Sequence, residues 1–296
     1  MPTKRADLAG SWYPGDEPAL AREVDACVAK AGVEYARTAT LEGEPTAIIA
    51  PHAGLAFSGA VAAAAFNAVR AGLERVDVFV VFGAVHRARL SHPAIWPDGV
   101  WETPLGDIAV DDEFTHMLID DDVVHADATA FPGDNAIELQ TPFIKRLFPE
   151  ARMVPVAMPY LRDAWRVGER VSAAARRLGR AAVAIASTDL THYGEAFGVL
   201  PAGMGEPALE WTRRNDERFL RTLTEMDLDA IVPTASRDGS ACGAGAAAAA
   251  AGWSRERGCS SGRLLAHTNS HEVMPRGEAE HFVGYASIVY EMPKRR

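Results

Sequence analysis

The chain is poor in cysteine, since its 296 residues include only Cys27, Cys242 and Cys259. Small secreted proteins that depend on disulfides carry many paired cysteines, and an odd, sparse set excludes that kind of framework. Such a set is typical of a protein kept in a reducing compartment. We therefore expect a cytoplasmic protein whose thiols stay free.

A long apolar run is also missing. The N-terminal segment MPTKRADLAGSWYPGD has no apolar stretch of the length found in signal peptides. The longest run of small apolar residues covers 246–251, whereas a membrane-spanning helix needs about 20 apolar residues. These observations predict a chain that neither enters nor contacts a membrane.

Basic residues are fewer than acidic ones, with 30 Lys and Arg against 40 Asp and Glu, and the net charge is −10. Nucleic-acid-binding proteins usually present a basic face, so this balance argues against a nucleic-acid partner. Hydrophobic residues make up 48% of the chain, which is ordinary for a soluble globular protein. Because no linker or internal repeat is visible, we expect one domain over residues 1–296.

Five short apolar runs rich in β-branched residues are typical of buried strands. None of them alternates cleanly between apolar and polar residues, which is the pattern of strands covered on both faces. The runs are TAIIA (46–50), VDVFVVF (76–82), RMVPVAM (152–158), AAVAIA (181–186) and VGYASIVY (283–290).

Segments with helical character lie between these runs. Their alternation with the strands predicts an α/β fold, with a central mixed, largely parallel sheet flanked by helices. Segments 89–107 and 255–281 show neither pattern, and we expect them to be long loops. The helices are expected at 17–32, 58–73, 163–180, 208–227 and 240–253.

Three of the predicted strands run into polar residues. His52 follows the first of the five runs, and His86 follows the second. Asp189 and His192 follow the fourth run. The carboxyl ends of parallel strands line the ligand crevice of an α/β sheet, so these side chains converge if the strands are neighbours. Taken singly, each has a plainer explanation, as a hydrogen-bonded loop histidine or a turn-capping aspartate.

Cys242 is the cysteine with the strongest functional context. It precedes Gly243, Gly245 and a run of alanines, which are strong helix formers. A cysteine at a helix N-terminus loses its proton more readily, so Cys242 is a candidate thiolate, either as a metal ligand or as a nucleophile. The plainer alternative is a small buried hydrophobic residue, the usual fate of a free cysteine.

Two imidazoles and one anionic group form a familiar metal-binding set. With a carboxylate the set is the facial triad of non-haem Fe(II) oxygenases, and with a thiolate it also suits zinc or copper. The candidate ligands are scattered along the chain, so their spacing alone does not decide between Asp189 and Cys242 as the third ligand.

Eight motifs follow one another in a specific order along nearly the whole chain. In this order and spacing they resemble the Memo family, protein B of the bacterial and archaeal AmmeMemoRadiSam gene neighbourhood. The motifs are AGSWYPGD (9–16), IIAPHAGLAFSG (48–59), FGAVHR (82–87), WETPLGDI (101–108), IELQTPFI (137–144), ASTDLTHYG (186–194), CGAG (242–245) and VGYASIVY (283–290).

The resemblance implies a fold similar to that of class III extradiol dioxygenases, and a metal pocket. It also implies a functional link to a radical-SAM protein. The family's metal ligands fall on His52, His86 and Cys242, the polar pair beside them on Asp189 and His192, and the aromatic pair at the pocket mouth on Trp12 and Tyr13.

The chain departs from the family pattern at one pocket position. The family commonly has Glu-His-Ser where this chain has Asp134-Asn135-Ala136. The amide of Asn135 cannot titrate, so any proton transfer that the family's histidine performs is absent or moved here.

Three functions fit this set of residues. The first is a mononuclear metal oxidoreductase of dioxygenase-like type, with iron, or else copper or zinc, acting on a small substrate such as an aromatic one. His192 would be its acid–base group, and Asp189 would orient His192 or a ligand imidazole. The second is a metal-, ligand- or peptide-binding protein without turnover. The third is a hydrolase with Cys242 as nucleophile, His192 as base and Asp189 as orienting group.

Overall fold

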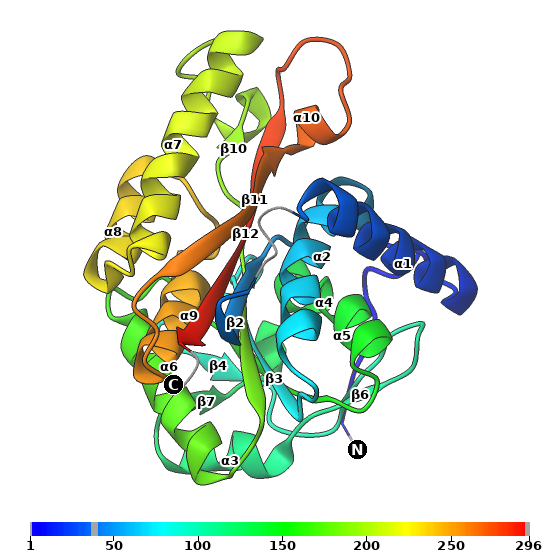
Figure 1. The fold of residues 1–296 in the computed structure, drawn as a ribbon, viewed down its shortest axis with the longest axis vertical. Coiled ribbons are helices and arrows are strands. Elements are labelled where there is room, and N and C mark those ends of the chain that lie inside the picture. The colour runs from blue at the N-terminus through cyan, green and yellow to red at the C-terminus, as the bar shows by residue number, and fades with distance from the viewer. Residues whose placement is uncertain (1, 37–40, 294–296) are drawn as a thin grey trace.

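The computed structural model describes residues 2–36 and 41–293, and its centre is a mixed sheet with helices on both faces (Figure 1). Nine strands form this sheet, in the order β10-β12-β2-β9-β3-β8-β4-β7 with β11 added beside β12. Its four central strands are parallel: β2 (Gly43–Ala50), β9 (Ala182–Ser187), β3 (Val78–Gly83) and β8 (Arg152–Ala157).

Antiparallel strands complete both sides of the parallel centre. The long strand β12 (Phe282–Pro293) pairs with β2 on one side, and β4 (Ala94–Ile95) pairs with β8 on the other. The outer strands are β10 (His192–Tyr193), β11 (Gly262–Asn269) and β7 (His125–Ala126). A separate small sheet contains β1 (Thr3–Lys4), β5 (Val100–Trp101) and β6 (Ile108–Ala109).

The helices divide between the two faces of the sheet, as Figure 1 shows. On one face lie α1 (Glu17–Glu34), α2 (Leu55–Gly72) and α5 (Thr141–Leu147). On the other lie α6 (Ala164–Arg177), α7 (Glu206–Thr224), α8 (Leu228–Asp238) and α9 (Ala244–Glu256). Shorter helices are α3 (Asp112–Asp120), α4 (Asn135–Glu138) and α10 (Ser270–Val273).

Each face of the sheet has its own hydrophobic core, because successive strand residues point in opposite directions. In β2, Ile49 packs into the core beneath α6 and α9, whereas Ile48 packs into the core beneath α1 and α2. In β3, Phe82 and Phe79 divide in the same way. Both faces are therefore buried, which explains why the strand sequences show no polar alternation.

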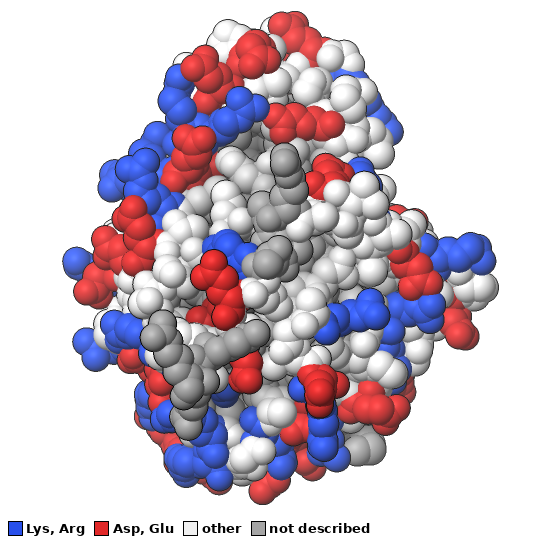
Figure 2. All heavy atoms as spheres, viewed as in Figure 1, with Lys and Arg blue, Asp and Glu red and all other residues white. Residues whose placement is uncertain are grey.

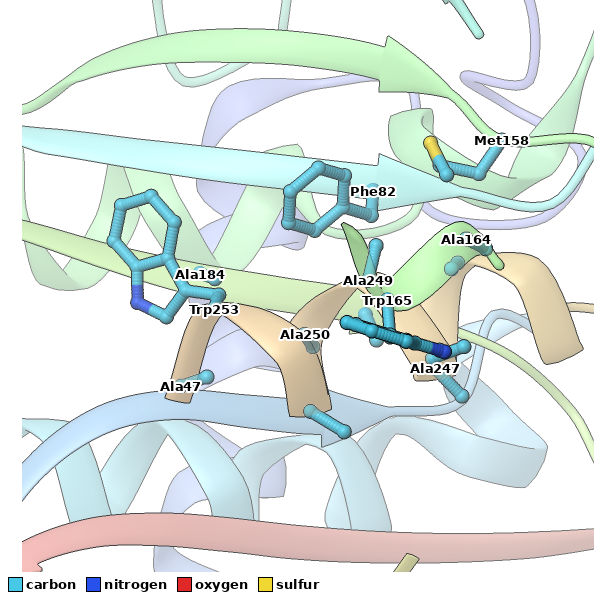
Figure 3. Close-up of a cluster of buried hydrophobic side chains, with 14 of the residues drawn as sticks. Ala47, Phe82, Met158, Ala164, Trp165, Ala184, Ala247, Ala249, Ala250 and Trp253 are labelled. Carbon is cyan, nitrogen blue, oxygen red and sulfur yellow. The ribbon is translucent and has the colours of Figure 1, made fainter. Parts of the chain in front are cut away.

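The alanines of α9 allow unusually close helix packing. Figure 3 shows Ala247 and Ala250 of this helix near Trp165 of α6, in a cluster of buried side chains that also contains Phe82 and Ala184 of the sheet. Small residues on both helices permit the approach, since a Cβ added to Gly168 of α6 would collide with the carbonyl oxygen of Ala249. The alanine run is thus a packing feature, and it fixes where the N-terminus of α9 lies.

Among residues 2–36 and 41–293, α2 is the only helix whose length and composition would suit a membrane span, and 61% of its window is buried inside the protein. It packs between α1 and the sheet and contributes Phe66 and Val69 to the core. This is the behaviour of the core helix of a soluble protein.

Most of the predicted elements are confirmed, with ends shifted by a few residues. The prediction of a long loop over 255–281 is wrong, because this segment contains β11 and α10. β11 lies at the edge of the sheet beside β12, and most of its side chains are only partly buried. Such a strand lacks the continuous apolar run by which the central strands were found.

Charged side chains of both signs are interspersed on the face shown in Figure 2, around a largely uncharged middle area. No broad basic area appears on this face.

Replacing Gly168 with alanine should lower the free energy of unfolding by about 1–3 kcal/mol, because the new methyl group forces α6 away from α9. The matched control is Gly32→Ala in α1, where an added Cβ meets no atom within 4 Å. The control should be neutral or slightly stabilising, since alanine is the better helix former. Urea unfolding midpoints measure both changes, and equal midpoints for the two variants would contradict the packing argument.

Candidate metal centre

The strand register brings His52 and His86 together. Ser187, the last residue of β9, is the register partner of both Ala50 in β2 and Gly83 in β3, so the three strands end at one level. The two histidines follow these ends, and their ring centroids lie 5.1 Å apart with the rings nearly perpendicular. One ligand atom each from His52, His86 and Cys242 lie within 4.8 Å of one another, as the ligands of one metal ion would.

The hydrogen bonds of Ser187 fix the tautomer of His52. The Ser187 hydroxyl donates its single proton to the carbonyl oxygen of Ala136 and accepts from the Gln140 amide at 2.9 Å. It can therefore only accept from His52 Nδ1, which lies 3.0 Å away. The unprotonated Nε2 of His52 then faces Cys242 Sγ at 3.1 Å, which is the orientation that a metal ligand needs.

His86 is oriented by a carboxylate in the same way. Asp134 accepts from the backbone N–H of His86 at 2.7 Å and lies 3.2 Å from its Nδ1. Burial alone would raise the pKa of Asp134, but hydrogen bonds from His86 and Ala136 lower it below the ordinary value. An ionised Asp134 can only accept, so Nδ1 of His86 carries the proton and Nε2 is left as the ligand atom.

Burial sets the protonation state of His52. The side chain of His52 is 1% exposed, and burial, together with the nearby His86, lowers the pKa of His52 to about 3. His52 is therefore neutral at physiological pH, as metal binding requires. The His86 side chain is 32% exposed, so the centre opens toward solvent on this side.

Cys242 differs from the expectation of a readily formed thiolate. Burial and the neighbouring Asp189 raise the pKa of Cys242, although the backbone N–H of Asp189 donates to its sulfur at 3.3 Å. α9 begins at Ala244 with Gly243 as its cap, so Cys242 lies just outside the first helical turn. Without a metal ion this residue is a thiol; coordination would remove its proton.

Asp189 supports the His52 loop. Its Oδ1 accepts from the backbone N–H of His52 at 2.7 Å, and its Oδ2 lies 4.0 Å from His52 Nε2. In the described part of the chain no hydrogen bond joins Asp189 to His192; Nδ1 of His192 instead lies 3.0 Å from the carbonyl oxygen of Leu190. The sequence analysis expected Asp189 to orient either His192 or a ligand imidazole. The contacts of Asp189 in the structure are with His52, which is a candidate ligand.

The two aromatic residues expected at the pocket mouth differ in their exposure to solvent. Trp12 is 42% exposed, and its carbonyl oxygen accepts from the N–H of Leu55, close in sequence to His52. Tyr13 is 3% exposed, and its hydroxyl donates to the buried carboxylate of Glu138. The hydroxyl of Tyr13 is therefore held inside the protein by Glu138, and the place of Tyr13 in the pocket lining stays a prediction.

Asn135 contacts the candidate centre through its side-chain amide, which binds the backbone of His52. Its amide nitrogen donates to the carbonyl oxygen of His52 at 3.0 Å. The residue thus holds the His52 loop, a role that needs a donor but no titration.

Sequence reasoning missed the residues that orient the two histidines. Ser187 lies within one of the motifs and Asp134 in the stretch that departs from the family pattern, but neither was given a role. Gln140 was missed as well, although it donates to both Ser187 and Pro51. The available signal was the polar residue that ends an otherwise apolar strand, since buried polar groups need partners.

The donor set suits a transition metal. Two neutral imidazoles and one thiol that coordination deprotonates are ligands for iron, copper or zinc, whereas calcium and magnesium prefer oxygen. Three protein ligands also leave coordination positions for other molecules. The residues of this centre therefore fit a metal ion of this class.

Ser187→Ala should weaken metal binding by about 10- to 100-fold, because His52 loses the acceptor that fixes its tautomer and ring orientation. Ser287→Ala is the matched control, since Ser287 is also buried on a strand but its hydroxyl has no partner among the described residues. Competition titration with a chromogenic zinc chelator gives both affinities. Equal affinities in Ser187→Ala and the parent protein would contradict the assigned tautomer.

Curated archaeal proteins resemble this chain over nearly its whole length. A "MEMO1 family protein MK0963" of Methanopyrus kandleri is 34% identical over 96% of this chain and 97% of its own length. A "MEMO1 family protein" of Thermococcus onnurineus is 34% identical over the same shares. Among solved structures, an "uncharacterized protein JW3007" from Escherichia coli K12 covers 83% of this chain and 99% of its own, at 12% identity and a TM-score of 0.49.

The family comparison agrees with these relatives. The model described as "Memo-like protein" matches residues 4–289, a span that includes His52, His86 and Cys242. The chain therefore belongs to the Memo-like protein family.

Proposed function

We propose that this chain is a mononuclear metal protein, and that it acts as a dioxygenase-like oxidoreductase on a small substrate in the cytoplasm. The observation that carries the proposal is the convergence of His52, His86 and Cys242, whose ligand atoms lie within 4.8 Å of one another. Iron is the metal we favour, with copper or zinc as alternatives. A bound redox metal would supply an electron path between oxygen and an organic substrate.

The protein residues around the centre supply orientation and proton handling. Ser187 and Asp134 hold the two ligand histidines, each through its Nδ1. His192 begins β10, three residues after Asp189, with Nδ1 directed to a carbonyl oxygen and Nε2 left unprotonated. Histidine is the side chain that most often transfers protons in enzymes, so we assign His192 as the acid–base residue.

A binding protein without turnover remains the alternative on the same metal centre. Its motivation is the Cys242 thiol, because the class III extradiol dioxygenases that the Memo family resembles have a glutamate in that place. The two functions share the metal ligands and differ only in whether substrate is oxidised, so an oxygen-uptake assay separates them.

A metal-free cysteine hydrolase is the third candidate, and one contact favours it. Cys242 Sγ lies 3.1 Å from His52 Nε2, the geometry of a nucleophile and its base. The base would then be His52, whereas the sequence analysis assigned that role to His192. Burial weighs against this function, because it raises the pKa of Cys242 and disfavours the nucleophilic thiolate.

Protein purified without a metal-binding tag should contain about one equivalent of a transition metal. The variants His52→Ala and Cys242→Ser should each lose this metal, because three protein ligands are needed for tight binding. Elemental analysis by mass spectrometry measures the content. The matched controls are His116→Ala, at an exposed residue of α3, and Cys27→Ser, outside the centre, and both should retain the metal. A metal-free parent protein, or full occupancy in His52→Ala, would refute the proposal.

His192→Gln should keep the metal but lower the turnover number about 10²- to 10⁴-fold, the usual contribution of a general acid or base. The measurement is oxygen uptake with whichever member of a panel of catechols and phenols the parent protein oxidises. His271→Gln, at a histidine on α10, should leave the rate unchanged. No oxygen uptake by the metal-loaded parent protein with any member of the panel would favour the binding protein instead.

A further inference from the structure

A pocket of about 270 Å³ lies at the carboxyl ends of β3 and β8. One wall is the loop that follows β3, and the other is the segment that follows β8. Ligand crevices of open α/β sheets lie at this edge. The lining residues are Val85, Ala88, Arg89, Leu90, Met158, Pro159 and Tyr160.

Both walls of this pocket adjoin ligands of the candidate metal centre. Val85 directly precedes His86 in the chain. On the opposite wall, the hydroxyl of Tyr160 donates to the carbonyl oxygen of Ala241, the residue before Cys242. A molecule held in this pocket would therefore contact residues joined directly to the segments that carry His86 and Cys242.

The segment that follows β8, which forms the second wall of the pocket, packs directly against the N-terminus of α9. A Cβ added to Gly245 would collide with the carbonyl oxygen of Pro159, so the helix N-terminus lies directly against the wall. The position of Tyr160 is thus coupled to that of Cys242 through packed backbone.

Arg89 is the single charged residue of the pocket lining. Within residues 2–36 and 41–293 it makes no ion pair and no hydrogen bond, although this chain has ten more acidic than basic residues. The neighbouring Arg87 is directed elsewhere, since a Cβ added to Gly133 would lie 3.6 Å from its Nε. One guanidinium is therefore available to an anionic ligand.

The remaining lining suits a flat apolar group. The pocket is smaller than the about 300–1,000 Å³ of sites for drug-sized ligands, so it fits a single substituted ring. The ring of Tyr160 and the thioether of Met158 make favourable contacts with aromatic rings. A guanidinium binds a carboxylate through two parallel hydrogen bonds.

We propose that this pocket binds a small aromatic carboxylate, with the ring against Met158 and Tyr160 and the carboxylate on Arg89. The inference rests on the proposed function, because it names the substrate class of the same metal centre. Arg89 would then be a specificity-determining residue, which selects an acid over a neutral molecule of the same shape.

Binding of benzoate and of its neutral analogue benzamide tests the proposal on the full chain loaded with zinc. Methyl-¹³C methionine labelling gives one signal for each of the eight methionines, and Met158→Leu assigns the one in the pocket. We expect benzoate to shift the Met158 signal and to bind about tenfold more tightly than benzamide, as one charge-assisted contact predicts.

Two arginine variants locate the charge that is responsible. Arg89→Met keeps the apolar stem and should reduce benzoate affinity to that of benzamide. Arg87→Met removes a charge from the same loop outside the pocket and should leave benzoate affinity unchanged.

The proposal is overturned if benzoate binds Arg89→Met as tightly as the parent protein, as direct coordination to the zinc ion would produce. It is also overturned if benzoate shows no preference over benzamide, or if the Met158 signal does not move. Zinc content is measured on the same samples. An Arg89-dependent benzoate preference in protein that cannot hold zinc would support the pocket while refuting the proposed metal function.

Discussion

The hydroxyl of Ser187 is the contact on which the candidate metal centre depends. Ser187 ends the strand between β2 and β3, and its backbone sets the level at which both neighbours end. Its side chain then fixes the His52 ring, while its own proton goes to the Ala136 carbonyl. One residue thus joins the register of the sheet to the orientation of a metal ligand.

Close packing of α9 against the end of β9 brings Cys242, the third candidate ligand, to the two histidines. A Cβ on Gly243 would approach Ser187 and Thr188, so this helix can reach the end of β9 only with glycine at that position. That approach places Sγ of Cys242 3.1 Å from Nε2 of His52. Because the ligands are buried or braced by hydrogen bonds before any metal binds, little ordering is required on binding.

The sequence predicted the central strands, the main helices and the convergence of His52 with His86, because apolar runs and the strand-to-histidine pattern are local signals. Cys242 as the third ligand was implied by the family resemblance, since spacing alone left Asp189 open for that place. It did not predict β11, whose stability comes from pairing with β12 and not from its own apolar content. The hydrogen bond of Tyr13 was not predicted, because its partner Glu138 lies 125 residues away along the chain. Hydrogen-bond partners such as Ser187 and Asp134 depend on tertiary contacts, which spacing along the chain does not reveal.

The central claim is that His52, His86 and Cys242 hold one metal ion together. X-ray absorption spectroscopy at the zinc edge, on protein loaded with one equivalent of zinc, tests this claim most directly. The account predicts one sulfur neighbour at about 2.3 Å and two imidazole nitrogens at about 2.0–2.1 Å, with the sulfur signal lost in Cys242→Ser. A spectrum with nitrogen and oxygen neighbours alone, or a sulfur signal that persists in Cys242→Ser, would contradict it.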